Sequence, residues 1–535
     1  MKQYIFFTIA FFGSIGLHSQ SCFVYEKTLT RQSQIDSFPI NYPGCSSLFG
    51  EIEISGPDIL NLNGLMGLKE ILSLTISNTN NLTSLSGLDS IQTVSWNLRI
   101  EGDTGLLNLA QLGSLRSAGT ISIKNNDLLA NLNGLNSLTE ISSIGIEGND
   151  GLQNLSGLDN LDTIYGTLNI EYNPLLKDMT GLGSLKSVGN IFQVDHNAAL
   201  KNFIGLFSLS EVKGSVGIEA NFFMENLIGL ESLRAVLQDV DITSNTRLGS
   251  LVGLNSLEYV GRNFSIEYNY QIISMDGLQS LKTVGRTFKL SYNTHLVHLT
   301  GLESLDSIQH DLNVNHLPLI DFTGLESLKF IGGEFTSVSN EIQSFNGLNS
   351  LNTIDGGIHL SSNDALTDLN GLESVKTIRK KIYIGSNHEL LTLSGLDYFD
   401  AQSVDGITLH RNTSLSHCAI ESICQFLMKD TINASENITG CNTSSEILSV
   451  CVVALNEALH EDENLIFPNP TSAFIDFTGI DLIDSEIRIM DSQGRFVDEY
   501  NVLNNRIDMS SLPNGIYFIS FLSQNQRTIK RVIKI

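Results

Sequence analysis

A repeat of 23 or 24 residues runs from Leu62 to Phe399, and it leaves few folds open to the chain. An apolar residue stands two positions before the Gly of each repeat, and another stands three positions after its Leu. Self-similarity at this period is typical of a solenoid, in which each turn packs only on its neighbours. Leu112 behind Gln111 takes the place of one pair, and the other Gly-Leu pairs begin at Gly64, Gly87, Gly134, Gly157, Gly181, Gly205, Gly229, Gly253, Gly277, Gly301, Gly324, Gly347, Gly371 and Gly395.

Each repeat contains one short stretch that alternates apolar and polar residues. Leu168 and Ile170 alternate with Asn169 and Glu171, which is the period-2 pattern of a strand with one buried face. No segment between these stretches carries a helical pattern. We therefore expect an all-β chain, a right-handed parallel β-solenoid whose strands stack at about 4.8 Å over roughly 70 Å.

An Asn stands eight residues before the Gly in ten repeats. A short side-chain amide tolerates left-handed turns and bonds to nearby backbone, so these residues predict a buried ladder at one corner. They are structural candidates, not binding candidates: Asn126, Asn149, Asn173, Asn197, Asn221, Asn245, Asn269, Asn293, Asn363 and Asn387.

The Leu-x-Ile-x-x-Asn-x-x-Leu core, followed by Gly-Leu-x-Ser-Leu, is similar to a leucine-rich repeat. The long turn looks more like the receptor L domain, the ligand-binding solenoid of growth-factor receptor ectodomains. The resemblance covers about residues 45 to 415. It implies a solenoid fold and a binding role, and it supplies no catalytic residue and no ligand.

Charge and targeting signals narrow the possible partners. The 535 residues include 31 Lys+Arg and 58 Asp+Glu, and the net charge of -27 argues against nucleic acid and anionic membranes. Residues 1–19 are expected to be a signal peptide, with Lys2 before an apolar run from Ile5 to Leu17. No later apolar run reaches the roughly 18 residues of a membrane span.

All six cysteines lie outside the repeats, at Cys22, Cys45, Cys418, Cys424, Cys441 and Cys451. An even number in an exported chain predicts disulfides. We expect Cys22 to pair with Cys45, while the four later cysteines allow three pairings; lipidation of Cys22 and a zinc site are weaker alternatives. The expected segments are an N-terminal cap at 20–60, the solenoid at 61–415, a Cys-rich cap at 416–455 with a helix from Ile420 to Met428, and an acidic linker at 456–464.

The last segment, 465–535, changes character and predicts a small β-sandwich. Strands are expected at 474–477, 486–490, 516–522 and 528–535, with turns at 491–494 and 512–515. Four motifs resemble the C-terminal sorting domain of type IX secretion substrates: Phe-Pro-Asn-Pro-Thr from Phe467, Ile-Met-Asp-Ser-Gln-Gly from Ile489, Leu-Pro-Asn-Gly-Ile-Tyr-Phe from Leu512, and the basic stretch from Lys530 to Lys534. The resemblance implies recognition by the type IX machinery and export to, or release from, the outer-membrane surface of a Gram-negative bacterium.

The candidate site is the strand face of the fifth to tenth turns, where acids and aromatic residues form adjacent columns. The residues proposed to bind a ligand are Glu171, Tyr172, Asp195, His196, Glu219, Glu267, Tyr268 and Tyr292. Aromatic rings beside carboxylates suit a sugar or a protein partner. Tyr383 is placed in the same aromatic column. The alternative is a solvated face whose rings cover the corners. No cofactor is expected, apart from an open question of Ca²⁺ on the carboxylates.

An enzyme is the second reading, because β-helices can carry polysaccharide-acting sites. No repeat departs from the period by more than one residue, so no loop is available to build a pocket. The only close histidine pairs are His295 with His298 and His310 with His316, and the first pair lacks an acidic third ligand for a metal. We therefore expect a secreted or surface-bound, non-catalytic binding or adhesion protein, with a purely structural surface-layer component as a third reading.

Overall fold

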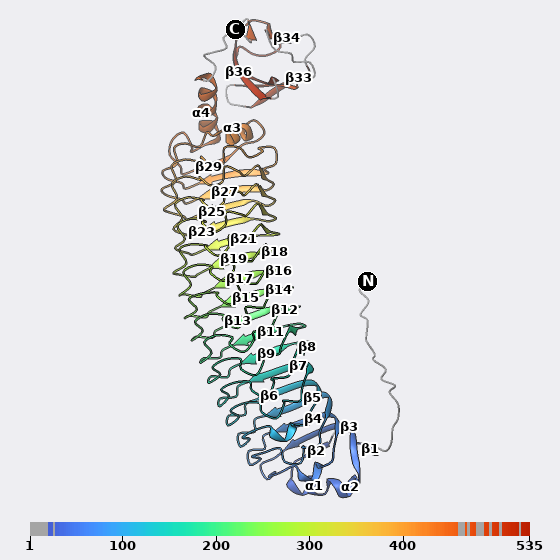
Figure 1. Ribbon diagram of the computed structural model, residues 1–535. Helices are drawn as coiled ribbons and strands as arrows, with labels where there is room; N and C mark the ends of the chain where they lie inside the picture. Colours follow the sequence, from blue (N-terminus) through green and yellow to red (C-terminus); the bar gives the residue numbers. More distant parts are fainter. Residues whose placement is uncertain are drawn as a thin grey trace. The chain divides into compact units, whose positions relative to one another are not determined.

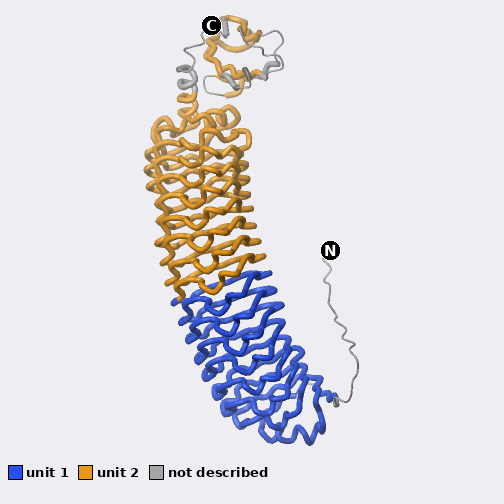
Figure 2. Tube along the Cα trace, in the orientation of Figure 1, with its two compact units in different colours: residues 1–223 blue, residues 224–535 orange. Residues whose placement is uncertain are grey.

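The computed structural model describes residues 20–24, 27–457, 466–467, 471–477, 486–491, 495–501, 506–523 and 526–535. The signal peptide expected at 1–19, and most of the linker expected at 456–464, lie outside these residues. The chain divides into two compact units, Met1–Phe223 and Met224–Ile535, coloured separately in Figure 2. No helix among the described residues is long and apolar enough to cross a membrane.

Unit 1 is a parallel β-solenoid, with its strands stacked turn on turn (Figure 1). Neighbouring turns are in register, so that Leu168 pairs with Phe192 and Ile170 with Val194. The early turns carry long strands and the later turns carry a two-residue and a four-residue strand. The strands are β3 (Cys45–Ser55), β4 (Glu70–Ser77), β5 (Thr93–Glu101), β6 (Ser117–Lys124), β7 (Glu140–Glu147), β8 (Thr163–Ile164), β9 (Leu168–Glu171), β10 (Ser187–Val188), β11 (Phe192–Asp195), β12 (Glu211–Val212) and β13 (Val216–Glu219), with 3₁₀ turns at η1 (Asn63–Leu65) and η2 (Ala110–Leu112).

The solenoid turns of unit 2 follow the same plan, with two strands in each turn up to β27 and one in each of the last two turns. Phe264 pairs with Phe288 and Ile266 with Leu290, which keeps the apolar columns continuous within the unit. The strands are β14 (Ala235–Val236), β15 (Val240–Thr243), β16 (Tyr259–Val260), β17 (Phe264–Glu267), β18 (Thr283–Val284), β19 (Phe288–Ser291), β20 (Ser307–Ile308), β21 (Leu312–Asn315), β22 (Phe330–Ile331), β23 (Phe335–Val338), β24 (Thr353–Ile354), β25 (Ile358–Ser361), β26 (Thr377–Ile378), β27 (Lys381–Gly385), β28 (Gly406–His410) and β29 (Asn433–Ser435).

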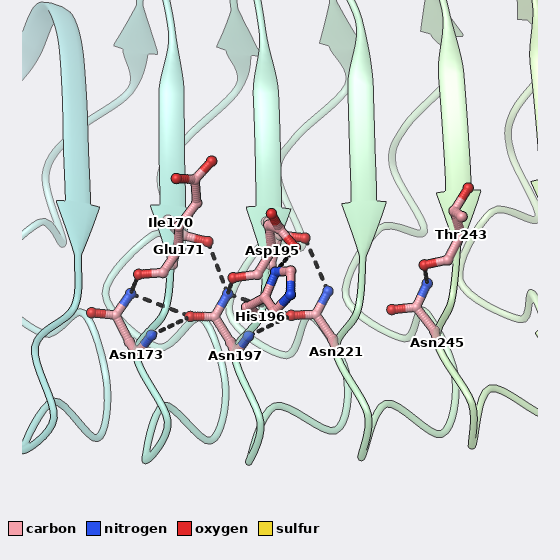
Figure 3. A network of polar contacts seen from close by, with 10 residues as sticks. Ile170, Glu171, Asn173, Asp195, His196, Asn197, Asn221, Thr243 and Asn245 are labelled. Carbon is pink, nitrogen blue, oxygen red and sulfur yellow. Dashed lines mark hydrogen bonds and ion pairs between the residues drawn. The ribbon is translucent and has the colours of Figure 1, made fainter.

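The expected asparagine ladder is present and fully buried. In Figure 3 the side chains of Asn173, Asn197 and Asn221 follow one another along the corner. The Oδ1 of Asn197 accepts the backbone N–H of Asn173 at 3.1 Å, and the Nδ2 of Asn197 donates to the carbonyl of Ile170 at 2.8 Å. Each amide thus satisfies polar backbone that the turn would otherwise bury unpaired. The same column also holds Thr79 and Asp103 in unit 1, and Leu317, Asn340 and Asn412 in unit 2.

The repeated glycines are required by their contacts as well as by their backbone. Gly205 has a φ of 114°, and Gly181 in the preceding turn has a φ of 112°. Residues other than glycine rarely adopt this region. A Cβ on Gly205 would lie 2.3 Å from the carbonyl carbon of Met179 in the preceding turn. The amide of the repeated Gly also has a side-chain acceptor in many turns: Gly157 donates to Asp159 at 2.8 Å. At Gly205 the turns therefore approach one another too closely for a side chain.

A column of alternating charge runs along the outside of unit 2. Arg234 lies 3.9 Å from Glu258, and Lys282 lies 2.7 Å from the same carboxylate. Lys329 pairs with Asp306 at 2.7 Å in the next turns. Each pair joins adjacent turns and is exposed, so each contributes at most about 1 kcal/mol. We call these five residues the charge column.

The N-terminal end of unit 1 is covered by strands and two short helices. β1 (Gln20–Phe23) and β2 (Lys27–Leu29) pair with β3, and α1 (Gln32–Asp36) and α2 (Phe38–Asn41) follow them. The side chains of Ile35 in α1 and Phe38 in α2 are buried. The sequence pattern does not reveal these helices, because five and four residues are too few to show a helical period. Cys22 is bonded to Cys45, as expected.

Two helices follow the last turns of unit 2. α3 (Glu421–Leu427) lies inside the expected helix, whereas α4 (Ser444–Glu457) was missed. Its start has a readable signal, since Thr443-x-x-Glu446 is a capping pattern and Thr443 Oγ1 accepts the Glu446 N–H at 3.2 Å. The helix is not apparent from the sequence because Val450, Val452 and Val453 are β-branched residues, which favour a strand. Disulfides join Cys418 to Cys441 and Cys424 to Cys451, so all six cysteines are paired.

The C-terminal segment forms two antiparallel sheets. One sheet contains β30 (Ile466–Phe467), β31 (Phe474–Phe477) and β34 (Arg506–Asp508). The other contains β32 (Glu486–Asp491), β33 (Phe496–Asn501), β35 (Gly515–Ser523) and β36 (Gln526–Lys534). Side chains of both sheets share one core, in which Ile475 and Ile507 meet Ile489 and Ile519. The expected β-sandwich is therefore present. The four strands expected from alternation are found, and β30, β33 and β34 are additional.

Candidate binding face

The residue before each ladder position adopts the left-handed conformation, throughout both units. In the early turns of unit 1 this residue is Asn78, Gly102, Asn125 or Gly148, the residue types that the conformation favours. Tyr172 and His196 follow at the same position with φ of 54° and 53°. A side chain other than Gly or Asn here costs about 1–2 kcal/mol. The fold does not require an aromatic ring at this corner, because neighbouring turns form it at lower cost.

The aromatic residues of this position form one stack in each unit. In unit 1 the ring centroids of Tyr172 and His196 are 4.6 Å apart at an interplanar angle of 17°, and Phe222 meets His196 edge-on at 6.3 Å. We call these three residues the aromatic corner. In unit 2, Tyr268 and Tyr292 stack at 4.8 Å and 4°.

The stacked geometry changes what these rings can offer to a ligand. Each stacked contact covers one face of both rings, so the columns present mainly ring edges and tyrosine hydroxyl groups. Ring faces free for a sugar are therefore scarce. The stack of unit 2 also includes His316, at 4.5 Å from Tyr292, which the sequence analysis did not include. Tyr383 is not in this column; it lies on β27 and contacts His359.

The carboxylates of unit 1 lie on neighbouring strands in register. Glu147 pairs with Glu171 across β7 and β9, Glu171 with Asp195, and Asp195 with Glu219. We call these four residues the acidic strip. Glu147 is 2.7 Å from Lys124, and Asp195 contacts the ring of His196 (Figure 3). Among the described residues, the carboxylates of Glu171 and Glu219 have no cationic partner at ion-pair distance.

Glu171 is the electrostatically strained member of the acidic strip. Burial raises the pKa of Glu171 above its ordinary value, and the charges of Asp195 and Glu147 raise it further. The Asn169 amide and His196 oppose the shift without reversing it. A positive group placed on this strip would relieve the repulsion, so the strip favours a cationic ligand.

The corresponding carboxylate of unit 2 is already satisfied. Glu267 accepts Ser265 Oγ at 2.8 Å and Ser291 Oγ at 2.9 Å, and it lies 2.8 Å from Lys289 Nζ. Burial acts to raise the pKa of Glu267, but these hydrogen bonds outweigh burial and lower it. Of the proposed site residues, those of unit 1 are therefore the ones with unused binding capacity. In the described part of the chain, no group of three or more His, Cys, Asp or Glu side chains could hold a metal ion.

Comparisons with known proteins give a clear result for the C-terminal segment alone. Residues 465–535 match the family model of the secretion system C-terminal sorting domain. A search of curated proteins finds no match. Among solved structures, a leucine-rich repeat protein from Bacteroides ovatus ATCC 8483 matches with 14% identity over 62% of this chain and 84% of that one. Its TM-score of 0.16 is too low for the likeness to bear on function.

The sorting domain indicates the location of the protein. Of its sequence motifs, residues 515–518 lie in β35 and the basic stretch lies in β36, whereas 468–470 and 492–494 lie outside the described residues. Such domains are recognised by the type IX secretion machinery. The chain is thus a leucine-rich, parallel β-solenoid protein with a type IX C-terminal sorting domain, secreted or attached to the outer-membrane surface.

Proposed function

We propose that this protein is a non-catalytic binding protein at the cell surface or outside the cell, and that unit 1 binds a basic, extended segment of a protein partner. The site consists of the acidic strip and the aromatic corner. The observation that carries the proposal is the presence of Tyr172 and His196 at left-handed positions, beside Glu171 and Asp195. Earlier turns form the same corner with Asn125 and Gly148 at lower cost.

The chemistry of the face supports this class of partner. Glu171 and Glu219 offer carboxylates without cationic partners among the described residues, so lysine or arginine side chains would find complementary charge. Ring edges and hydroxyl groups provide amphipathic contact area, which is common at protein interfaces. Rigid strands in register would lose little entropy when they bind a ligand that extends across several turns.

The regular turns support a non-catalytic role. The repeats contain no long excursion, so a polysaccharide-acting enzyme would lack a loop-built pocket on this face. Glycan binding through stacked rings is less favoured, because Tyr172 and His196 each cover one face of the other ring. A structural surface-layer role predicts no ligand at all.

The test is a double substitution that places residues suited to the left-handed backbone at this corner. The same change removes the two rings that we propose to contact the partner. Tyr172→Asn with His196→Asn places the residue type of the earlier turns at both sites, so thermal stability should be unchanged or higher. Binding of a labelled lysine-rich peptide, followed by fluorescence anisotropy, should be lost, and the wild-type signal should weaken as salt increases. A glutamate-rich peptide should not bind.

The matched control is Ser362→Asn with Ser386→Asn, at the equivalent left-handed positions of unit 2. It should bind the lysine-rich peptide as the wild type does. Equal binding by the Tyr172 and His196 variant would refute the proposed site. Wild-type binding to a glycan array but to no basic peptide would refute the partner class, and binding to neither would favour the surface-layer reading.

A further inference from the structure

The first turns of unit 1 contain a groove that is separate from the acidic strip and the aromatic corner. Its floor is the outer face of β4, where Ser73, Thr75 and Ser77 are all short. Register places Glu51 beside Ser73 and Glu53 beside Thr75 on β3, and Arg99 beside Thr75 on the β5 side. Long charged side chains thus form two walls above a floor of hydroxyl groups. We call this groove the polar trough; its volume is about 650 Å³, within the range of ligand sites.

Several groups in the polar trough have unused hydrogen-bonding capacity. Ser73 is only 5% exposed, and its Oγ has no hydrogen-bond partner in the described part of the chain. Arg99 is exposed and has no carboxylate or other acceptor among the described residues. The carboxylate of Glu51 is likewise without a partner there, whereas Lys124, at the far end, is paired with Glu147. A buried hydroxyl without a partner is unusual in native structures and calls for an explanation.

The free guanidinium and the surrounding acceptors restrict the ligand. A guanidinium binds a carboxylate through two parallel hydrogen bonds, so Arg99 calls for an acidic group. The lining holds Glu51, Glu53 and Glu101 as well as Lys27, Arg99 and Lys124, so its balanced charge does not favour a densely anionic polymer. The carboxylate oxygens accept hydrogen bonds from hydroxyl groups. A ligand rich in hydroxyl groups with sparse carboxylates meets both conditions.

The strand pairing of the trough and an exposed tryptophan favour a saccharide over a peptide. β4 is paired with β3 on one side and β5 on the other, so no free strand edge is available to a peptide main chain. Trp96 on β5 is 56% exposed and precedes Arg99 by three residues on the same strand, outside the lining of the trough. An exposed indole can contact the apolar face of a sugar ring.

We propose that the polar trough binds a uronic-acid-containing oligosaccharide, with Arg99 on the carboxylate and the floor hydroxyls and wall carboxylates on the sugar hydroxyls. This inference does not rest on the proposed protein partner, because it uses different strands and different residues.

The experiment titrates the full chain with a linear trimer of galacturonic acid and follows Trp96, the single tryptophan, by fluorescence. Saturable quenching is expected, with calorimetry to measure the Kd. Arg99→Gln should raise the Kd by roughly tenfold or more. Ser73→Ala should weaken binding less, because it removes one neutral hydrogen bond. Arg116→Gln, an exposed arginine on the same unit, is the matched control and should bind as the wild type does.

The comparison ligands decide between the alternatives. A neutral galactose trimer should bind more weakly than the uronate, and triglutamate should not bind. Triglutamate as effective as the uronate would mean simple anion capture, and a tighter heparin fragment would mean a site for dense negative charge; either result overturns the proposal. So does an unchanged Kd for Arg99→Gln, provided that its circular dichroism matches the wild type.

Discussion

Asp103 occupies a ladder position at which the following turns have asparagine, and its replacement by Asn should stabilise the protein. Its Oδ1 accepts the Thr79 backbone N–H and hydroxyl, both at 2.6 Å, but its Oδ2 is buried without a partner among the residues that the structure describes. Asn126 at the next position uses Nδ2 to donate to the carbonyls of Ile100 at 2.9 Å and Lys124 at 3.1 Å. By the register of the repeat, Asp103→Asn provides the corresponding two donors.

The expected gain follows from these bonds. Two neutral hydrogen bonds contribute about 1 kcal/mol each, so the free energy of unfolding should rise by about 2 kcal/mol at neutral pH. For a unit of this size such a gain corresponds to roughly 4–8 °C in Tm. Trp96 lies on the strand that leads to Asp103, so its fluorescence in a urea titration reports on the same turn.

The gain should depend on pH. Burial raises the pKa of Asp103; hydrogen bonds from Thr79 partly oppose this, and Glu101 adds to it. Because the folded pKa is above the unfolded one, the wild type loses stability as pH rises from the unfolded pKa through the folded pKa. The advantage of Asn should therefore be smallest in acid and should grow through that window.

The matched control is Asp127→Asn, which makes the same chemical change at an exposed position and should leave the urea midpoint unchanged. A lower midpoint for Asp103→Asn at neutral pH would refute the reasoning. So would an advantage that stays constant between acid and neutral pH.

A further substitution and a deletion test the corner and the export signal. Gly205→Ala should destabilise by about 3 kcal/mol or more, because of its left-handed backbone and its contact with Met179, whereas Gly183→Ala, whose added Cβ meets nothing closer than 3.8 Å, should be nearly neutral in the same urea titration. Deletion of 465–535 should strand the protein in the periplasm, as measured by cell fractionation and surface proteolysis; persistent surface display would contradict the role assigned to the sorting domain.

The fold was predictable because the repeat fixes both the buried columns and the spacing of the turns. Leu168, Ile170 and Asn173 each recur at a constant interval, and no alternative fold buries all of these columns together. The missed helices are short, as in α1 and α2, or rich in β-branched residues, as in α4. Local patterns of this kind carry little information until tertiary contacts are known.

The candidate site was predictable only as a set of columns. Sequence spacing places Glu171 and Glu267 in equivalent positions, and it cannot tell that Ser265, Ser291 and Lys289 satisfy only the second. The polar trough was not predictable, because it depends on the short side chains of β4 lying between longer ones on β3 and β5. The stacking of the Tyr172 and His196 rings could not be predicted either, because the orientation of a ring does not follow from sequence spacing.

The charge column of unit 2 has a consequence for how such a chain can evolve. Opposite signs alternate from Arg234 through Glu258, Lys282 and Asp306 to Lys329, so the pattern repeats every second turn. Gain or loss of a single turn within this stretch would set like charges against each other at the junction, which is unfavourable. Gain or loss of two turns would preserve the alternation. Duplications in pairs should therefore be tolerated better than odd ones, and the same parity penalises a folding chain whose turns pair one step out of register.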